Sequence, residues 1–202
     1  MPSRAGLTGL HESIAHMALT AQGGGQYRFE GSLDLDVIDV APQSSEELVA
    51  ELLAVGEPLT DLELNIVSLT WAHDGATALD VVAIDELSGE RLAAAPGRLV
   101  ATTSGLVAMK VTAIPLRAST RPEKRASDLY DLSRLLLAAG PDPASLVVMP
   151  PVLAAAVLER LTAWFVDDAG RDRTFREIRR FDEPSVDLDD VADAVEDLTS
   201  GA

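Results

Sequence analysis

The chain has 202 residues, of which 47% are hydrophobic and 24% are charged, so it can bury a core and is not globally disordered. It contains no cysteine, which excludes disulfides, zinc sites built on thiolates and cysteine nucleophiles. The formal net charge is −17, an unfavourable overall balance for a protein that binds nucleic acid, because phosphate binding needs local positive potential.

The sequence contains no membrane or export signal of the usual kind. Its first residues lack a charged segment followed by an apolar one, and no apolar run approaches the length of a membrane span. We therefore expect a soluble cytoplasmic protein that does not bind a membrane.

The first half of the chain is predicted to mix helices and strands. Periodicity of the apolar residues and the turn signals between them predict helices over 8–20 and 46–55. Alternation predicts strands from Tyr27 through the Asp-x-Asp stretch at 31–39, and over 62–71, 78–84 and 99–103. The segment 86–97 is typical of a loop.

The second half is predicted to be entirely helical. Helices are expected over 105–116, 128–139, 152–165, 172–180 and 186–198, and residues 117–126 form a polar, basic loop. The predicted fold class is therefore α+β: a mixed sheet with flanking helices over 1–103, followed by a helical bundle over 104–202.

The stretch Gly31 to Asp39 contains the strongest candidate site. As a strand it places Leu33, Leu35 and Val37 on one face and Ser32, Asp34 and Asp36 on the other. Two carboxylates on one strand face repel each other, and a divalent cation between them removes that repulsion. Gly31 and Ser32 offer donors to a phosphate beside such a metal. An edge strand with a solvated acidic face is the alternative.

Three further residues are candidates because of their surroundings. Asp80 interrupts an apolar strand, so it needs a hydrogen bond, an ion pair or a metal if it is buried. Lys110 is the one lysine in an apolar helical stretch and either reaches solvent or faces an anion. Asp128 follows a basic patch at the predicted start of a helix, where it favours the helix dipole.

Taken together and in this order, these motifs resemble the AbiEii-type nucleotidyltransferase toxins of the DNA polymerase β-like superfamily, which include the mycobacterial MenT toxins. The most specific match is a Met-Lys-x-x-Ala helix, then an arginine, then a basic Asp-Leu-Tyr-Asp-Leu segment. Here these are Met109 to Ala113, Arg117, and Arg125 to Leu132. Ser32-x-Asp34-x-Asp36 matches the metal-binding motif of the family, and Asp80 falls where the superfamily has its third carboxylate.

The resemblance implies a nucleotidyltransferase fold and a set of roles. Asp34, Asp36 and Asp80 would bind Mg²⁺ or Mn²⁺, and Gly31 and Ser32 would contact the phosphates of an NTP. Lys110 would neutralise charge that develops on the triphosphate, and Asp128, or alternatively Asp131, would complete the site.

The activity implied is transfer of NMP from an NTP to the 3′ end of tRNA or another RNA, which blocks translation, under the control of a cognate antitoxin protein. Basic residues at 171–180 are either the RNA-contacting face or a solvated helix that pairs with the acidic tail.

Two alternatives follow from the same residues. The family has a Gly-Gly-x-Ala-Leu strand–helix unit before the acidic strand, whereas here Asp34 comes within ten residues of Gly25. That departure favours a fold relative that has lost catalysis and acts as a binding or regulatory protein. A nucleotidyltransferase acting on a protein hydroxyl or a small molecule is the third possibility.

Overall fold

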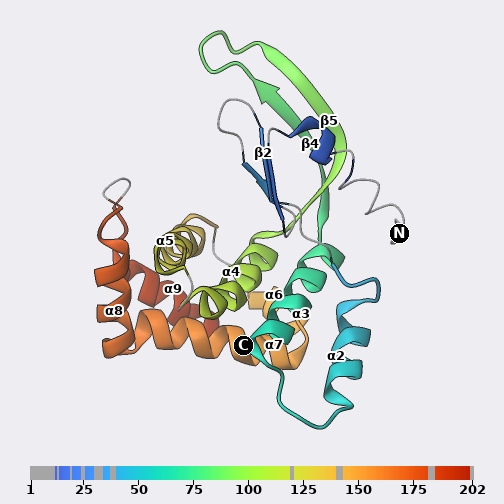
Figure 1. Ribbon diagram of the computed structural model, residues 1–202. Helices are drawn as coiled ribbons and strands as arrows, with labels where there is room; N and C mark the ends of the chain where they lie inside the picture. The colour runs from blue at the N-terminus through green and yellow to red at the C-terminus, as the bar shows by residue number, and fades with distance from the viewer. Residues whose placement is uncertain are drawn as a thin grey trace. The chain divides into compact units, whose positions relative to one another are not determined.

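The protein is described here from a computed structural model, shown in Figure 1. The described residues are 12, 14–18, 20–23, 26–29, 34–36, 40–118, 121–139, 143–181 and 185–200. Contacts divide the chain into two units, Met1–Pro42 and Gln43–Ala202, each of which is considered by itself. Helices and antiparallel strands are both present, which confirms the predicted α+β class. No helix in this described part is long and apolar enough to cross a bilayer.

The first unit contains a small antiparallel sheet with strand order β1-β2-β3, formed by β1 (Thr20–Gly23), β2 (Gln26–Arg28) and β3 (Asp34–Asp36). In β2 and β3, Arg28 lies opposite Asp34 and Gln26 lies opposite Asp36. The strands predicted near Tyr27 and at the Asp-x-Asp stretch are thereby confirmed, and residues 14–17 are helical as expected.

The second unit begins with two capped helices, α2 (Ser45–Leu53) and α3 (Asp61–Asp74). The strand predicted over 62–71 is wrong, because this segment belongs to α3. Alternation of its first leucines suggested a strand, but Thr60 and Glu63 form a capping box that starts a helix. The buried residues follow helical spacing, with Leu64, Val67 and Ser68 on the inner face.

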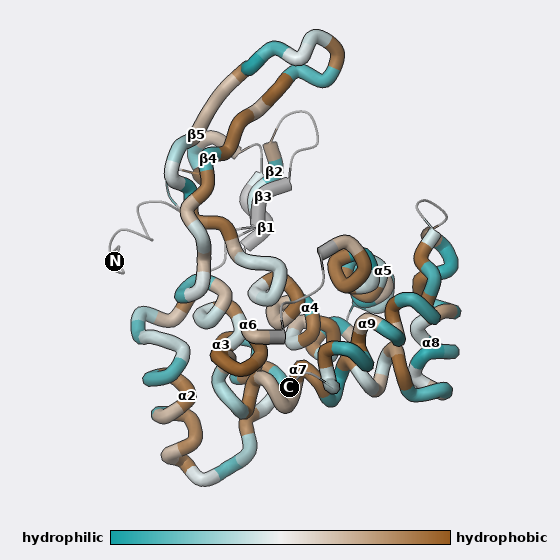
Figure 2. Tube along the Cα trace, turned by 180° about the vertical axis from the view of Figure 1, so that it is seen from behind, coloured by the Kyte–Doolittle hydropathy of each residue, from teal (hydrophilic) through white to brown (hydrophobic). Residues whose placement is uncertain are grey.

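A two-stranded antiparallel hairpin follows, made of β4 (Thr77–Ile84) and β5 (Arg91–Val100). The strand predicted at 78–84 is confirmed as β4, and it pairs with β5. The loop predicted over 86–97 is wrong from Arg91 onward, because that sequence continues in β5. All eight residues of β4 are exposed. The hairpin extends away from the helices of its unit (Figure 1), and hydrophobic residues run along β4 (Figure 2).

The rest of the second unit is helical, as predicted. The elements are α4 (Thr103–Arg117), α5 (Pro122–Ala139), α6 (Pro143–Val147), α7 (Pro151–Leu161), a π-helix η2 (Thr162–Val166), α8 (Asp168–Ile178) and α9 (Leu188–Ser200). The loop predicted over 117–126 is wrong in its second half, because α5 begins at Pro122. Proline is favoured at the first position of a helix, and Arg125 is buried through an ion pair with Glu177 of α8.

The core of this unit lies between the helices. Its largest fully buried side chains include Val67 of α3, Ile114 of α4, Leu129 of α5 and Phe165 of η2. The boundary predicted at 103/104 falls inside the second unit, where α3 packs against α4 across it. These two helices also share hydrogen bonds: the Thr112 hydroxyl accepts a partly buried one from Asn65 Nδ2 at 3.1 Å and forms a buried one of 2.7 Å with the Ser68 hydroxyl.

The chain turns at Asp167 between η2 and α8, and almost no space is left between the two helices. A Cβ atom built on Gly170 would lie 1.6 Å from the carbonyl oxygen of Ala163. The Thr174 hydroxyl donates a 2.9 Å hydrogen bond to the Trp164 carbonyl across the same contact. Glycine at this position is therefore required for the helices to meet.

Candidate functional site

Charged side chains of α4 and α5 form a four-membered cluster, here called the Lys110 cluster. Lys110 Nζ lies 3.1 Å from Asp128 Oδ1 and 2.7 Å from Asp131 Oδ2. Arg117 Nη1 contacts the other oxygen of Asp128. The cluster thus contains two cations from α4 and two carboxylates from α5.

Helical spacing places each pair on one face of its helix, and the packing of α4 against α5 brings the two pairs together. Lys110 and Arg117 are seven residues apart, which is about two turns, so they lie on one face of α4. Asp128 and Asp131 are three residues apart and lie on one face of α5. The Thr102 hydroxyl, which accepts a hydrogen bond from the Gly105 amide at 3.2 Å, fixes where α4 begins.

Burial differs sharply among the members of the Lys110 cluster. The Asp128 side chain is 2% exposed, whereas those of Lys110 and Arg117 are 26% and 35% exposed and that of Asp131 is 47% exposed. Burying an isolated carboxylate as deeply as Asp128 would cost roughly several kcal/mol of hydration free energy. The two neighbouring cations compensate this cost. Asp128 therefore holds both cations in place from the inside, and Asp131 lies at the rim.

The arrangement leaves Lys110 able to serve an anion. An ammonium group has three N–H donors, and two of them are directed to Asp128 and Asp131 among the residues that the structure describes. The third donor and the exposed part of the side chain are available to a phosphate oxygen. A lysine fixed in this way presents a positioned charge rather than a freely rotating one.

From the sequence, Lys110 either reaches solvent or faces an anion; in the structure its ammonium group contacts two carboxylates of the protein itself, and its side chain is 26% exposed. Lys110 lies beside Asp128, and the resemblance implies a role for each of these two residues. Asp131, which the sequence analysis gave as an alternative to Asp128, belongs to the same cluster. Arg117 was noted only as part of a motif; its spacing of seven from Lys110 is the signal that could have assigned it.

Asp80 has a different environment from the one anticipated. It lies on β4, is exposed, and accepts a 2.9 Å hydrogen bond from the Gly97 amide of β5. The pairing of β4 with β5 is irregular between Leu79 and Val81, and Gly97 has a positive φ of 61° there. Asp80 thus bridges an irregular point of the hairpin, which explains an acid in an apolar strand without any burial.

The remaining predicted site residues belong to the first unit. Asp34 and Asp36 are the first and last residues of β3. Gly31 and Ser32 lie outside the described residues. Carboxylates two residues apart on a strand are chemically suited to Mg²⁺ or Mn²⁺, which prefer oxygen ligands.

A metal centre is not assembled elsewhere in the part of the chain that the structure describes. There, no group of three His, Asp or Glu side chains is placed to hold an ion. Comparisons of the chain with protein-family models, curated proteins and solved structures found no match.

Proposed function

We propose that the protein is a metal-dependent nucleotidyltransferase that transfers NMP from an NTP to the 3′ end of tRNA or another RNA, and that it is the toxin of a toxin–antitoxin pair. The observation that carries this proposal is the 3.1 Å ion pair between Lys110 and Asp128. It joins the two sequence segments that most resemble the AbiEii-type toxins, and it involves the residues for which that resemblance implies roles.

In this proposal, Lys110 stabilises the negative charge that develops as pyrophosphate leaves. Asp128 keeps the ammonium group oriented so that its third donor can reach the triphosphate, and Arg117 balances the remaining charge of Asp128. Asp34 and Asp36 would hold Mg²⁺ or Mn²⁺, which supplies electrostatic stabilisation of the transferred phosphoryl group. Asp80 is the proposed third carboxylate, and its hydrogen bond to Gly97 leaves oxygen lone pairs for this role.

Transfer is tested by incubating the protein with Mg²⁺ or Mn²⁺, total RNA and each α-labelled NTP in turn. We expect label in an RNA of tRNA size with at least one NTP. Asp36→Ala should abolish the transfer, whereas Glu90→Ala, which removes an exposed acid of the hairpin turn, should retain it. Absence of label with all four NTPs, or full activity of Asp36→Ala, would contradict the proposal.

One observation favours a second function, that of a binding or regulatory module without catalysis. The acid proposed as third carboxylate, Asp80, already bridges Gly97 in the hairpin. Thermal unfolding with each Mg²⁺–NTP separates the two functions when it is combined with the transfer assay, because a ligand that binds only the native state raises Tm. A raised Tm without transfer to RNA, protein or small molecule would favour the module.

A further inference from the structure

A basic and aromatic surface lies at the C-terminal end of α8, and it is here called the α8 face. Its members are Phe175, Arg176, Arg179, Arg180 and Phe181. Residues 171–180 hold five arginines and two acids in a chain whose net charge is −17. The α8 face is therefore a local exception to the charge of the whole protein.

Some arginines of this segment are neutralised by the protein. Arg171 pairs with Asp189 of α9, and Arg173 Nε lies 3.1 Å from Glu177, which also pairs with the buried Arg125. The acidic helix α9 thus neutralises the charge of Arg171.

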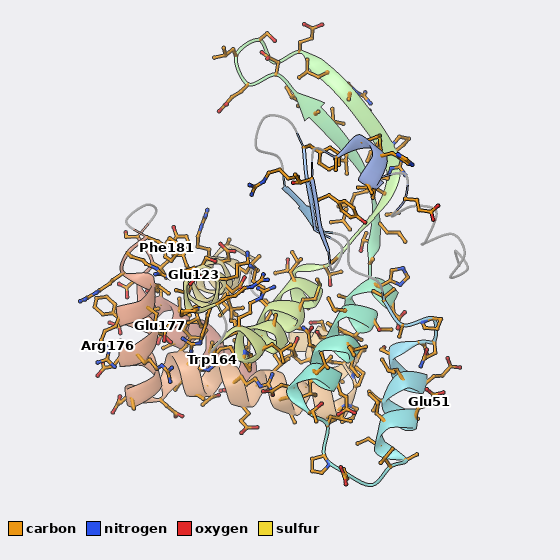
Figure 3. All side chains as sticks on the ribbon, viewed as in Figure 1. Glu51, Glu123, Trp164, Arg176, Glu177 and Phe181 are labelled. Carbon is orange, nitrogen blue, oxygen red and sulfur yellow. The ribbon has the colours of Figure 1, made fainter. Side chains whose placement is uncertain are left out.

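The exposed arginines Arg176 and Arg179 have no ion pair among the residues that the structure describes. Figure 3 shows Arg176 on the outer side of α8. Arg180 Nη2 donates to the Glu123 carbonyl at 3.1 Å, an acceptor without formal charge. Within the described ranges these guanidinium groups face no carboxylate, and such positive charge is suited to an anionic partner.

Aromatic rings accompany these charges. Phe181 stacks on Tyr130 of α5 with ring centroids 4.9 Å apart, and the guanidinium of Arg180 lies 5.4 Å from the centre of the Phe181 ring. Phe175 is 54% exposed and lines a hollow of about 250 Å³ together with Arg179. A second hollow of about 480 Å³, which Phe175 also lines, is bordered by Asp172, Asp187 and Asp189, so the basic surface lies on the side of Arg179. An exposed ring next to arginines offers a stacking surface to a planar base.

We propose that the α8 face binds single-stranded RNA, with Arg176 and Arg179 contacting phosphates and Phe175 stacking on an unpaired base. The inference rests on the proposed function for the identity of this RNA as the acceptor. An acidic peptide would use the arginines but would gain little from Phe175, and a duplex would keep its bases from the ring. The combination of charge and exposed aromatic surface therefore favours a single strand.

The α8 face is linked to the Lys110 cluster along α5. The contact of Arg180 with Glu123 joins the end of α8 to the first turn of α5. From there, the exposed Lys124 lies four residues before Asp128, on the same helical stripe. Four residues of helix rise by about 6 Å, so Lys124 places one basic side chain between the α8 face and the cluster. A strand bound on the α8 face would thus be directed along α5.

Binding is tested by fluorescence anisotropy with a fluorescein-labelled 12-nucleotide single-stranded RNA at several salt concentrations. Arg176→Gln combined with Arg179→Gln should weaken binding at least tenfold and lower the salt slope by about 1.4, since each single-strand phosphate contact contributes about 0.7. Phe175→Ala should weaken binding about tenfold with little change of slope. The matched control, Arg91→Gln with Arg98→Gln on exposed β5 positions, should stay within twofold. Equal affinity of all variants would overturn the inference.

The transfer assay separates this inference from the proposed function. If the wild type transfers NMP and the double α8 variant has an unchanged KM for RNA, the α8 face is refuted while the proposed function stands. If the variants lose RNA binding in a protein that transfers no nucleotide, the α8 face is supported and the proposed function is refuted. Competition by polyglutamate that matches or exceeds competition by RNA of equal charge would overturn the inference in favour of an acidic protein partner.

Discussion

The helices of the second unit and the β4–β5 hairpin use similar apolar residues in opposite ways. Helix α4 buries seven of its 15 residues, whereas all eight residues of β4 are exposed. Leu79, Val81 and Ile84 remain 48–60% exposed. Apolar burial therefore stabilises the helices, while the hairpin is held mainly by its backbone ladder, which is marginal for two strands alone. Substitutions in the helices should consequently affect global stability far more than equivalent ones in the hairpin.

The largest effect is expected from Gly170→Ala at the contact of η2 with α8. A methyl group there would overlap the Ala163 carbonyl, which is backbone and cannot turn aside. We expect a loss of about 3 kcal/mol in the free energy of unfolding, measured by urea denaturation.

The matched control for this change is Gly75→Ala at the end of α3. A Cβ there would meet the Trp71 carbonyl oxygen at 3.5 Å, an ordinary contact, and the backbone φ of −87° suits any residue. Stability should change by no more than about 0.5 kcal/mol. Equal losses for the two variants would show that the η2–α8 contact is not as close as described.

The next largest effect contrasts two acids. Asp128→Ala would leave Lys110 and Arg117 without their shared buried partner, and we expect a loss of about 2 kcal/mol, less than for a fully buried pair because both cations reach solvent. Asp80→Ala removes one exposed hydrogen bond and should cost about 0.5 kcal/mol. Urea denaturation of both variants gives the difference directly. A larger loss for Asp80→Ala would contradict the division between helices and hairpin.

A smaller effect is expected at the hydrogen bonds between α3 and α4. Thr112→Val keeps the shape of the side chain but removes the acceptor of Asn65 Nδ2 and the partner of the Ser68 hydroxyl. Because Ser68 also donates to the Asn65 carbonyl at 2.8 Å, the loss should be about 1 kcal/mol. Thr77→Val at an exposed position of β4 is the control and should leave the urea midpoint unchanged.

The sequence predicted best where one signal dominated. Helices α4, α7 and α9 have regular apolar spacing, and their existence follows from it. Prediction from the sequence failed where two signals conflicted. Alternation at the start of α3 suggested a strand, although the Thr60–Glu63 capping box indicated a helix. Polarity suggested a loop before Ser127, although Pro122 is well suited to start α5.

Local sequence motifs predict single candidate residues of the site, but not the contacts between them. The Met-Lys-x-x-Ala segment identified Lys110, but its pairing with Asp128 and Asp131 depends on how α4 and α5 pack. The role of Asp80 in bridging Gly97 depends on an irregular pairing of β4 with β5, and no local pattern in β4 specifies it. Contacts between distant segments are set by packing, which a single sequence does not display.

The smallest effect is expected for the pKa values of two carboxyl groups, Asp85 in the hairpin turn and Glu63 in the cap of α3. Hydrogen bonds from the Ser88 amide and hydroxyl to Asp85 lower the pKa of that carboxyl below its ordinary value of 3.8. Hydrogen bonds from the Thr60 amide and hydroxyl lower the pKa of Glu63 in the same way. Because its pKa is lowered, each carboxylate stabilises the folded state fully at a pH above its ordinary pKa. This stabilisation is lost as the pH falls through the lowered pKa.

Each carboxyl can therefore serve as the control for the other. Ser88→Ala should raise the pKa of Asp85 toward 3.8 and leave that of Glu63 unchanged, while Thr60→Ala should do the reverse, as followed by carboxyl ¹³C shifts in an NMR titration. Below the lowered pKa of Asp85, hydrogen exchange in β4 and β5 should accelerate before it does in α4, because the hairpin has little burial to keep it closed. Simultaneous acceleration in both would mean that the hairpin opens only when the helices unfold, and its stability would then have to come from contacts beyond its own ladder.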